Sequence, residues 1–305
     1  MILSIFFHWF FVCLTAPFFL GVIGRVKAFA SGKVGPPLLQ PYFDLGKLFR
    51  KRSIYSRNMT WVFRLAPAVT FAAMLAVSLL VPFGALKAPV QFEGDILLIV
   101  GVLALSRFFM IAAAMDTGFS MEGMGASREA FFACLSEVAL FMNFITLALL
   151  AHSLSLSRML GADSPVSWNL LGPALLLVVA SFFIVFLAEN CRIPIDDPDT
   201  HLELTMIHEV MLLEHGGVDL AYMFYAAAVK FFIFAAILVP IILPVQTEYL
   251  CVRMMSFLGG MLGLSVLVGI VESSMARIRL DRVRNLLLIS FALAFFGLIV
   301  ALWRG

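Results

Sequence analysis

The sequence carries little charge for its length. Of its 305 residues, 13% are Asp, Glu, Lys or Arg, whereas 62% are hydrophobic. A soluble domain is roughly one quarter charged and about half apolar. The composition therefore predicts an integral membrane protein. The net charge of +2 also gives no electrostatic basis for binding nucleic acid.

Metal-ligating residues are scarce too. No two cysteines form a C-x-x-C pair, which excludes the usual iron–sulfur, c-type haem and disulfide patterns. The four cysteines stand far apart, at Cys13, Cys134, Cys191 and Cys251. Only His8 and His152 are associated with apolar runs, each near an end, so haem ligation between helices is weakly supported. We expect no redox centre in this chain.

Polar linkers and low-complexity segments are absent, and the chain is divided instead into apolar runs. A membrane-spanning helix needs about 20 mostly apolar residues. No basic segment precedes the first run, so we expect it to be retained as a span. Because lipid offers no partner to open strands, residues 1–305 should form one all-α polytopic domain. Eight spans are predicted, at 2–23, 61–83, 95–115, 130–151, 170–189, 221–244, 252–271 and 284–302.

The basic residues lie mostly on one side of these spans. The loops 24–60, 116–129, 190–220 and 272–283, with Arg284 at the last boundary, hold 14 Lys and Arg residues. The other loops and the C-terminus hold 4. We expect the chain to lie in the cell inner membrane. The positive-inside rule then places the first set of loops on the cytoplasmic side and both termini on the opposite side.

Two of the basic loops have recognisable local patterns. Apolar residues recur at helical spacing over 38–49, which predicts an amphipathic helix in the membrane surface. It is either a plain surface helix or a wall for an amphipathic ligand or a docked subunit. In the loop 116–129, three glycines predict irregular backbone, and Ser127 is a candidate cap for the helix that follows.

Three ionisable residues fall inside predicted spans: Arg107, Glu137 and Lys230. An intramembrane charge costs at least about 2.5–3.5 kcal/mol, so such groups pair, line a wet cavity or relay protons. Glu137 could pair with Arg107 or with Lys230 to fix helix packing. The alternative that we favour is a proton or ion path.

The loop 190–220 is rich in acids and contains three of the five histidines. A helix is predicted to begin at Asp197 or at Thr200 and to end at Gly216-Gly217. His201, His208 and His215 are seven apart and would share one stripe of it. Leu212 occupies the position of the second histidine of an H-E-x-x-H motif, so no metal site is predicted. The acids indicate either a solvated helix face or a polar cavity.

The chain resembles the membrane subunit shared by respiratory complex I, where it is subunit 1, and by energy-converting NiFe hydrogenases. It is most similar to the hydrogenase-4 and formate hydrogenlyase type. The resemblance covers nearly the whole chain and rests on Gly35-Pro-Pro-Leu-Leu-Gln-Pro-Tyr-Phe-Asp44-Leu-Gly-Lys47, Asp116-Thr-Gly118, Gly123-Met-Gly-Ala-Ser-Arg-Glu129, Ser136-Glu137, Glu189 to Asp196 and Glu272 to Arg279.

The resemblance implies a subunit that anchors a hydrophilic arm and couples its electron transfer to proton or sodium translocation. It implies as partners NiFe-type large and small subunits, an iron–sulfur subunit and antiporter-like membrane subunits, besides lipid. The nickel–iron centre and the iron–sulfur clusters would belong to those partners, and a quinone is a possible ligand. A quinone-chamber subunit, an independent secondary transporter and a passive anchor remain alternatives.

Two groups of site residues follow. The expected proton or ion path comprises Arg107, Glu137, Glu189, Asp196, Asp197, Asp199, His201, Glu203, His208, Glu209, Glu214 and Lys230. The expected chamber and docking face comprise Arg25, Lys27, Gln40, Asp44, Lys47, Asp116, Arg128, Glu129, Arg192, Arg277 and Arg279. The chain departs from complex I relatives after Pro194 and at Lys230, where those relatives tend to carry an acid; both departures favour the hydrogenase branch.

Overall fold

Over the residues that the structure describes, the protein is all-α and has eight helices able to span a membrane. The computed structural model describes residues 2–56, 59–84, 86–161, 168–196, 206–244 and 249–304, and within these ranges no strand element occurs. Eight of the helices in these ranges are long and apolar enough to span, which confirms the predicted fold class. They are α1 (Ile2–Ala30), α3 (Trp61–Ser78), α4 (Asp95–Asp116), α5 (Ser120–Ala151), α7 (Trp168–Glu189), α8 (Gly217–Ile242), α9 (Leu250–Ser274) and α10 (Leu280–Arg304).

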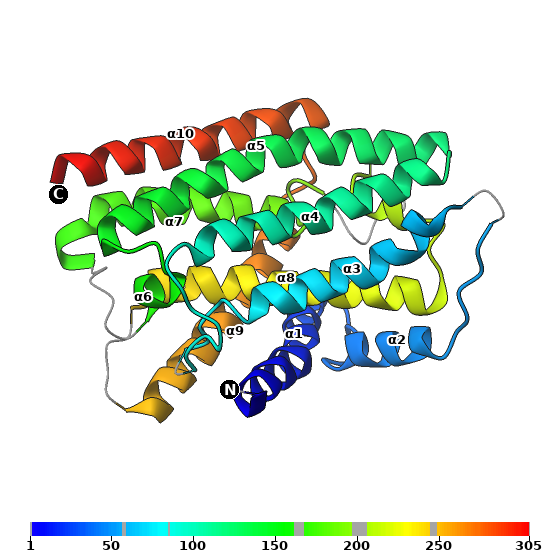
Figure 1. The fold of residues 1–305 in the computed structure, drawn as a ribbon, viewed down its shortest axis with the longest axis horizontal. Coiled ribbons are helices and arrows are strands. Elements are labelled where there is room, and N and C mark those ends of the chain that lie inside the picture. The colour runs from blue at the N-terminus through cyan, green and yellow to red at the C-terminus, as the bar shows by residue number, and fades with distance from the viewer. Residues whose placement is uncertain are drawn as a thin grey trace.

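Helix α8 is the centre of the bundle. Most of its side chains are buried, and it packs against α1, α3, α7 and α9. Helix α4 packs on α3 and α5, and α7 and α10 pack on α5. Figure 1 shows α3, α4, α5, α8 and α10 running along the long axis, with α1 and α9 on one side. The arrangement brings α4, α5, α7 and α8 together around one region.

A polar contact fixes α5, α7 and α10 to one another. The Asn143 side-chain amide donates to Ser181 Oγ at 2.9 Å. Ser181 Oγ in turn donates to the Ser290 carbonyl at 2.8 Å, and Ser290 Oγ donates to the Ser181 carbonyl at 3.0 Å. Small polar residues of this kind let helices approach closely and bond across their interface inside a membrane.

The predicted amphipathic helix is present as α2 (Gln40–Phe49). It begins two residues later than the pattern indicated, with Pro41 in its first turn, where proline costs no hydrogen bond. Leu45 is buried, whereas Phe43 is exposed. Helix α2 packs on α1 and α8.

Helix α5 begins earlier than predicted. The loop expected over 116–129 is reduced to three residues, and α5 starts at Ser120. Ser127 lies inside the helix and donates to the Met124 carbonyl, so its predicted capping role is wrong. Gly125 is needed for packing, because a Cβ there would clash with Val210 Cγ1. Gly125 therefore permits a close contact without breaking the helix, whereas Gly118 lies in the short turn before it with φ +71°.

The helix expected to end at Gly216-Gly217 is not formed over its described part. Residues 197–205 lie outside the described ranges, and residues 206–216 contain only a short 3-10 helix, η1 (Glu209–Leu212). Burial of Val210 and Met211 against the bundle overrides the helical pattern. Gly217 begins α8 with φ +56°, and its backbone lies so close to Arg52 that a Cβ would sit 2.6 Å from the Arg52 carbonyl.

A short helix, α6 (Leu156–Leu160), was not anticipated from the sequence. The buried Asp95 carboxylate at the start of α4 accepts hydrogen bonds from Ser155 Oγ at 3.0 Å and from the Leu156 N–H at 2.8 Å. A carboxylate from a distant helix thus supplies the cap that the local sequence lacks.

Candidate functional site

The candidate site is centred on Arg107 in α4. Its guanidinium contacts three carboxylates. Nη1 pairs with Glu137, Nη2 lies 2.5 Å from Glu189, and Nε lies 3.4 Å from Glu129. Only 10% of the Arg107 side chain is exposed, so its charge depends on these partners for compensation. The structure pairs Glu137 with Arg107, which resolves the two pairings that the sequence left open.

Glu189 at the end of α7 is the most enclosed carboxylate of this group, with 2% of its side chain exposed. Its Oε2 contacts both Arg107 and, at 2.8 Å, Lys230 Nζ of α8. Its Oε1 accepts a hydrogen bond from Ser136 Oγ at 2.7 Å. Two cations and a hydroxyl thus hold one ionised carboxylate. We call Arg107, Glu129, Glu137, Glu189 and Lys230 the charged cluster.

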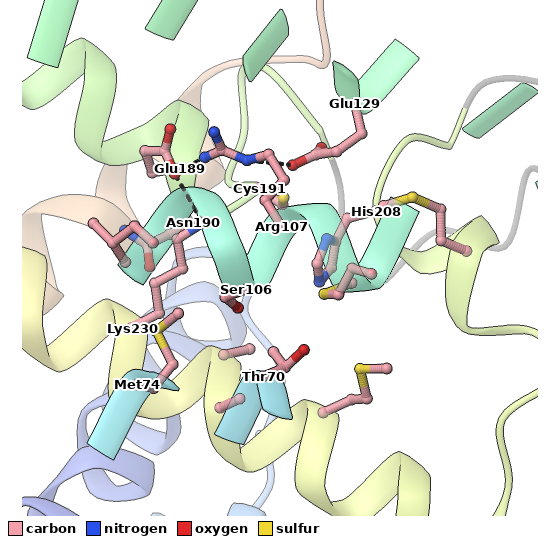
Figure 2. A pocket seen from close by; sticks show the side chains of 16 residues that line it. Thr70, Met74, Ser106, Arg107, Glu129, Glu189, Asn190, Cys191, His208 and Lys230 are labelled. Atoms are coloured by element: carbon pink, nitrogen blue, oxygen red, sulfur yellow. Dashed lines mark hydrogen bonds and ion pairs between the residues drawn. The ribbon is translucent and has the colours of Figure 1, made fainter. Parts of the chain in front are cut away.

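A small cavity of about 70 Å³ lies beside the charged cluster. Its polar lining includes Thr70, Asn190, Cys191 and His208, besides members of the cluster (Figure 2). A space of this size holds several waters. Buried polar atoms of Thr70, Asn190 and His208 have no hydrogen-bond partner within the described residues, so water or a ligand in the cavity would complete their bonding.

Two residues between the spans titrate away from their ordinary ranges. Burial lowers the pKa of His208, and nearby acids oppose the shift only in part. Burial also raises the pKa of the Cys191 thiol well above its usual range. Both groups are therefore neutral at pH 7, so the ionised side chains at this end of the cavity are those of the charged cluster.

A larger cavity of about 460 Å³ adjoins the first and shares Asn190, Cys191 and His208 with it. Its walls come from α1, α2, α8 and the segments after α7. Apolar side chains such as Leu20 and Phe231 share the lining with charged ones. A cavity of this volume and composition suits an amphipathic small molecule. Charged residues on its wall are Lys27, Asp44, Arg192, Asp196 and Glu209.

Glu272 forms a second buried ion cluster behind the larger cavity. Its side chain is fully buried and lies 3.1 Å from Lys27 Nζ and 3.4 Å from Arg192 Nη1. The contacts join α1, α9 and the segment after α7. Lys27 and Arg192 were expected at the chamber, whereas no role was predicted for Glu272.

Several residues expected on the docking face, and two expected on the proton or ion path, make contacts within the chain. Asp196 pairs with Arg277 at 2.8 Å and accepts from the backbone of residues 207 and 208. Arg128 donates to the Met206 carbonyl, and Arg25 donates to the Gly35 carbonyl. These contacts shape the loops. Further side-chain pairs are Gln40 with Asp44, Thr60 with Asp116 and Arg279 with Asp281. Arg279 is exposed. The backbone N–H of Glu214 donates a hydrogen bond to the Glu122 carboxylate.

The predicted histidine stripe is wrong for its described part. His208 lines the cavities, whereas His215 stacks on Phe63 of α3. No continuous helix carries both, because 206–216 packs as an irregular segment. Asp197, Asp199, His201 and Glu203 lie outside the described residues.

Sequence reasoning missed Ser136, Asn190 and Cys191 as members of the site, and it assigned Glu129 to the docking face. The structure places Glu129 on the charged cluster. A signal existed for two of them: Asn190 and Cys191 directly follow Glu189 at a span end. The signal for Glu129 was its spacing of eight residues from Glu137, which puts both on one face of a helix.

His215 supplies a test through pH. Its ring centroid lies 3.9 Å from that of Phe63, and burial lowers its pKa from 6.5 to about 4, against the opposing effect of Asp219. Between these values the unfolded chain binds the proton and the folded chain does not, so stability falls as pH drops from about 6.5 to 4. The difference corresponds to roughly 3 kcal/mol.

We expect His215→Phe to keep the stacking and to flatten the loss of thermal stability over this range of pH. Thermal unfolding of the purified chain in detergent at several pH values measures the effect. His152→Asn, at an exposed position, is the control and should leave the profile unchanged. An unaltered profile in His215→Phe would show that other groups cause the acid sensitivity.

The fold and the site define a class: a polytopic helical membrane protein with ionised groups buried between its spans. The profile of the family described as NADH dehydrogenase matches residues 2–302. The chain belongs to this family. The family resemblance inferred from the sequence motifs is confirmed.

Similar proteins span most of the chain. Hydrogenase-4 component C of Escherichia coli (strain K12) is 29% identical over 91% of this chain and 89% of its own length. Formate hydrogenlyase subunit 4 of the same organism is 29% identical over 93% of each. An NADH-quinone oxidoreductase subunit of Rubrobacter xylanophilus is 30% identical over 63% of this chain and 58% of its own length.

A solved structure has the same fold. A chain of the membrane-bound sulfane sulfur reductase, an archaeal respiratory membrane complex, superposes with a TM-score of 0.85. The match covers 98% of this chain and 99% of the other, at 21% identity.

Proposed function

We propose that this chain is the membrane subunit of a multisubunit energy-converting oxidoreductase of the hydrogenase-4 or formate hydrogenlyase type. It anchors a hydrophilic arm with a nickel–iron centre and iron–sulfur clusters, and it couples electron transfer in that arm to proton or sodium translocation. The observation that carries the proposal is the charged cluster, which runs between four spans from the cavities to the outer face of α5.

The cluster has the composition of a proton-accepting site. Three carboxylates face two cations, so one added proton brings the group to neutrality. A charge change at the cavity would shift which carboxylate holds that proton. Glu129 and Glu189 line the smaller cavity, and Glu137 lies further along α5.

Glu137 is the residue from which a proton would leave the charged cluster. One third of its side chain, 33%, is exposed, compared with 15% for Glu129 and 2% for Glu189. A carboxylate facing lipid is costly, so this face of α5 requires a polar neighbour. An antiporter-like membrane subunit at this position would receive the proton from Glu137.

The proposal includes an orientation. The basic loops and α2 lie on the cytoplasmic side of the cell inner membrane, as the positive-inside rule predicts, and both termini lie on the other side. The hydrophilic arm then docks over the larger cavity, whose wall includes the charged residues Lys27, Asp44 and Glu209. Arg279 is 80% exposed and belongs to the same docking face.

A second candidate is a quinone-chamber subunit, and the larger cavity favours it. Its volume of about 460 Å³ and mixed lining fit an amphipathic head group. A photoreactive quinone analogue should then label residues on α1, α2 or α8, and excess quinone should prevent labelling. Absence of competed labelling would count against a quinone site in this cavity.

The test of the proposed function is purification of the tagged chain in mild detergent, followed by mass spectrometry of the co-eluting proteins and metal analysis. We expect iron–sulfur and nickel-bearing subunits together with antiporter-like chains. Iron–sulfur subunits without nickel would favour the quinone alternative. A chain that elutes alone and catalyses uptake in liposomes would overturn the proposal in favour of an independent transporter.

A further inference from the structure

Three donor side chains of different chemistry meet on the wall of the smaller cavity. Glu129 comes from α5, Cys191 follows α7 and His208 precedes η1. One carboxylate oxygen, the Cys191 Sγ and one imidazole nitrogen all lie within 4.8 Å of one another. Figure 2 shows the three side chains along one part of the cavity, next to Arg107. No pair of them is close in sequence.

The backbone conformation at Cys191 gives no reason for a cysteine at this position. Helix α7 ends with the Arg192 N–H donating to the Leu187 carbonyl at 2.9 Å, and Cys191 has φ +50°. This left-handed position after a helix is usually taken by glycine or asparagine. A glycine would complete the same cap more favourably. The thiol is therefore an addition that the fold does not require.

The imidazole of His208 has a ring nitrogen that makes no hydrogen bond within the described residues. Its backbone N–H donates to Asp196 Oδ2 at 3.1 Å, which fixes the segment. Its Nδ1 is shielded from solvent and has no hydrogen-bond partner within the described residues. A buried polar atom without a partner is costly, and an imidazole nitrogen without a hydrogen bond is a good metal ligand.

We propose that Glu129, Cys191 and His208 form a binding site for one divalent cation of borderline softness, with Zn²⁺ the best match. Zinc accepts carboxylate oxygen, imidazole nitrogen and thiolate sulfur, whereas Mg²⁺ and Ca²⁺ require oxygen. Zinc–ligand bonds of about 2.0–2.3 Å place tetrahedral ligands roughly 3.3–3.8 Å apart. Side-chain rotations bring the observed atoms to that spacing, and the cavity leaves a fourth position for water.

The charge balance of binding is favourable. The Cys191 thiol loses its proton to solvent as the zinc–sulfur bond forms, so Zn²⁺, one thiolate and one carboxylate sum to zero. Glu129 turns from Arg107 to the metal. Arg107 keeps Glu137 and Glu189 as partners. The site therefore adds no uncompensated charge to the bundle.

Zn²⁺ binding to the purified full chain in its complex tests the proposal. Competition with a chromogenic chelator gives the affinity, and the thiolate-to-cobalt absorption of a Co²⁺-loaded sample reports sulfur ligation. Zinc should also protect Cys191 from alkylation. Cys134→Ser/Cys251→Ser removes two exposed cysteines and is the matched control.

We expect one high-affinity equivalent in the wild type and in the control variant. Cys191→Gly should retain the helix cap and fold, lose the cobalt–sulfur absorption and bind zinc at least roughly tenfold more weakly. Glu129→Gln and His208→Asn should weaken binding similarly. Equal affinity in Cys191→Gly, loss of binding in the cysteine control, or no high-affinity equivalent in the wild type would each overturn the proposal.

Discussion

Replacing Arg107 with methionine is expected to destabilise the protein more than any other single substitution in the site. The change leaves Glu129, Glu137 and Glu189 facing one another with Lys230 as the remaining cation. Removing one partner of a buried ion pair costs about 3–5 kcal/mol. The unfolding temperature of the purified chain in detergent should fall on the order of 10 °C.

The double variant Arg107→Met/Glu137→Gln separates the electrostatic cause from lost packing. It removes one unpaired carboxylate while Lys230 still pairs with Glu189, so part of the stability should return. No recovery would mean that the methionine variant fails through packing. Arg107→Lys should be intermediate, because one ammonium cannot replace a planar guanidinium that contacts three carboxylates.

Replacing Glu137 with glutamine is expected to uncouple ion translocation from electron transfer. The amide keeps the shape of the carboxylate but neither accepts nor releases a proton, while Arg107 retains Glu129 and Glu189. In inverted membrane vesicles, most of the ion gradient formed per electron pair should be lost, because a proton relay cannot pass a group that does not exchange protons. The rate of electron transfer should change little.

Glu93→Gln is the matched control for this experiment. It makes the same carboxylate-to-amide change in a pair with Arg158 whose side chains are more than half exposed, and such pairs contribute little. Its vesicles should pump like the wild type. Full pumping in Glu137→Gln would contradict the coupling role and would favour a passive anchor.

The spans were predictable because each one is an apolar run long enough for a helix, which satisfies all of its backbone hydrogen bonds within the run itself. The ends of the helices were less predictable. Glycine in a soluble loop usually marks a turn, but Gly125 lies in α5 because Val210 occupies the space of a side chain. Only the tertiary contact distinguishes these two uses of glycine.

Ionisable residues in the spans could be identified from the sequence, but their partners could not. Arg107 and Lys230 were equally plausible partners for Glu137. The packing of α4 on α5 and of α7 on α8 decides that Arg107 contacts Glu137 and that Lys230 contacts Glu189. Helical periodicity places a charge on one face of its helix but contains no information about the facing helix.

Residues 206–216 were the hardest part to predict. Its acids and histidines suggested a polar helix, yet Val210 and Met211 are buried and draw the chain into the bundle. His208 and Cys191 thereby reach one cavity from segments 17 positions apart. Their proximity depends on the direction that the backbone takes after Glu189, which no local pattern specifies.

Helix α5 has a mechanical consequence. Its 32 residues make a rod of about 48 Å, longer than the roughly 30 Å of membrane hydrocarbon. The projecting end touches the irregular segment at Gly125, and Glu129 and Glu137 follow on the same unbroken rod. Because the helix is continuous, a displacement of its projecting end at Gly125 would be carried to Glu129 and Glu137 together and would change both of their distances to Arg107 at the same time.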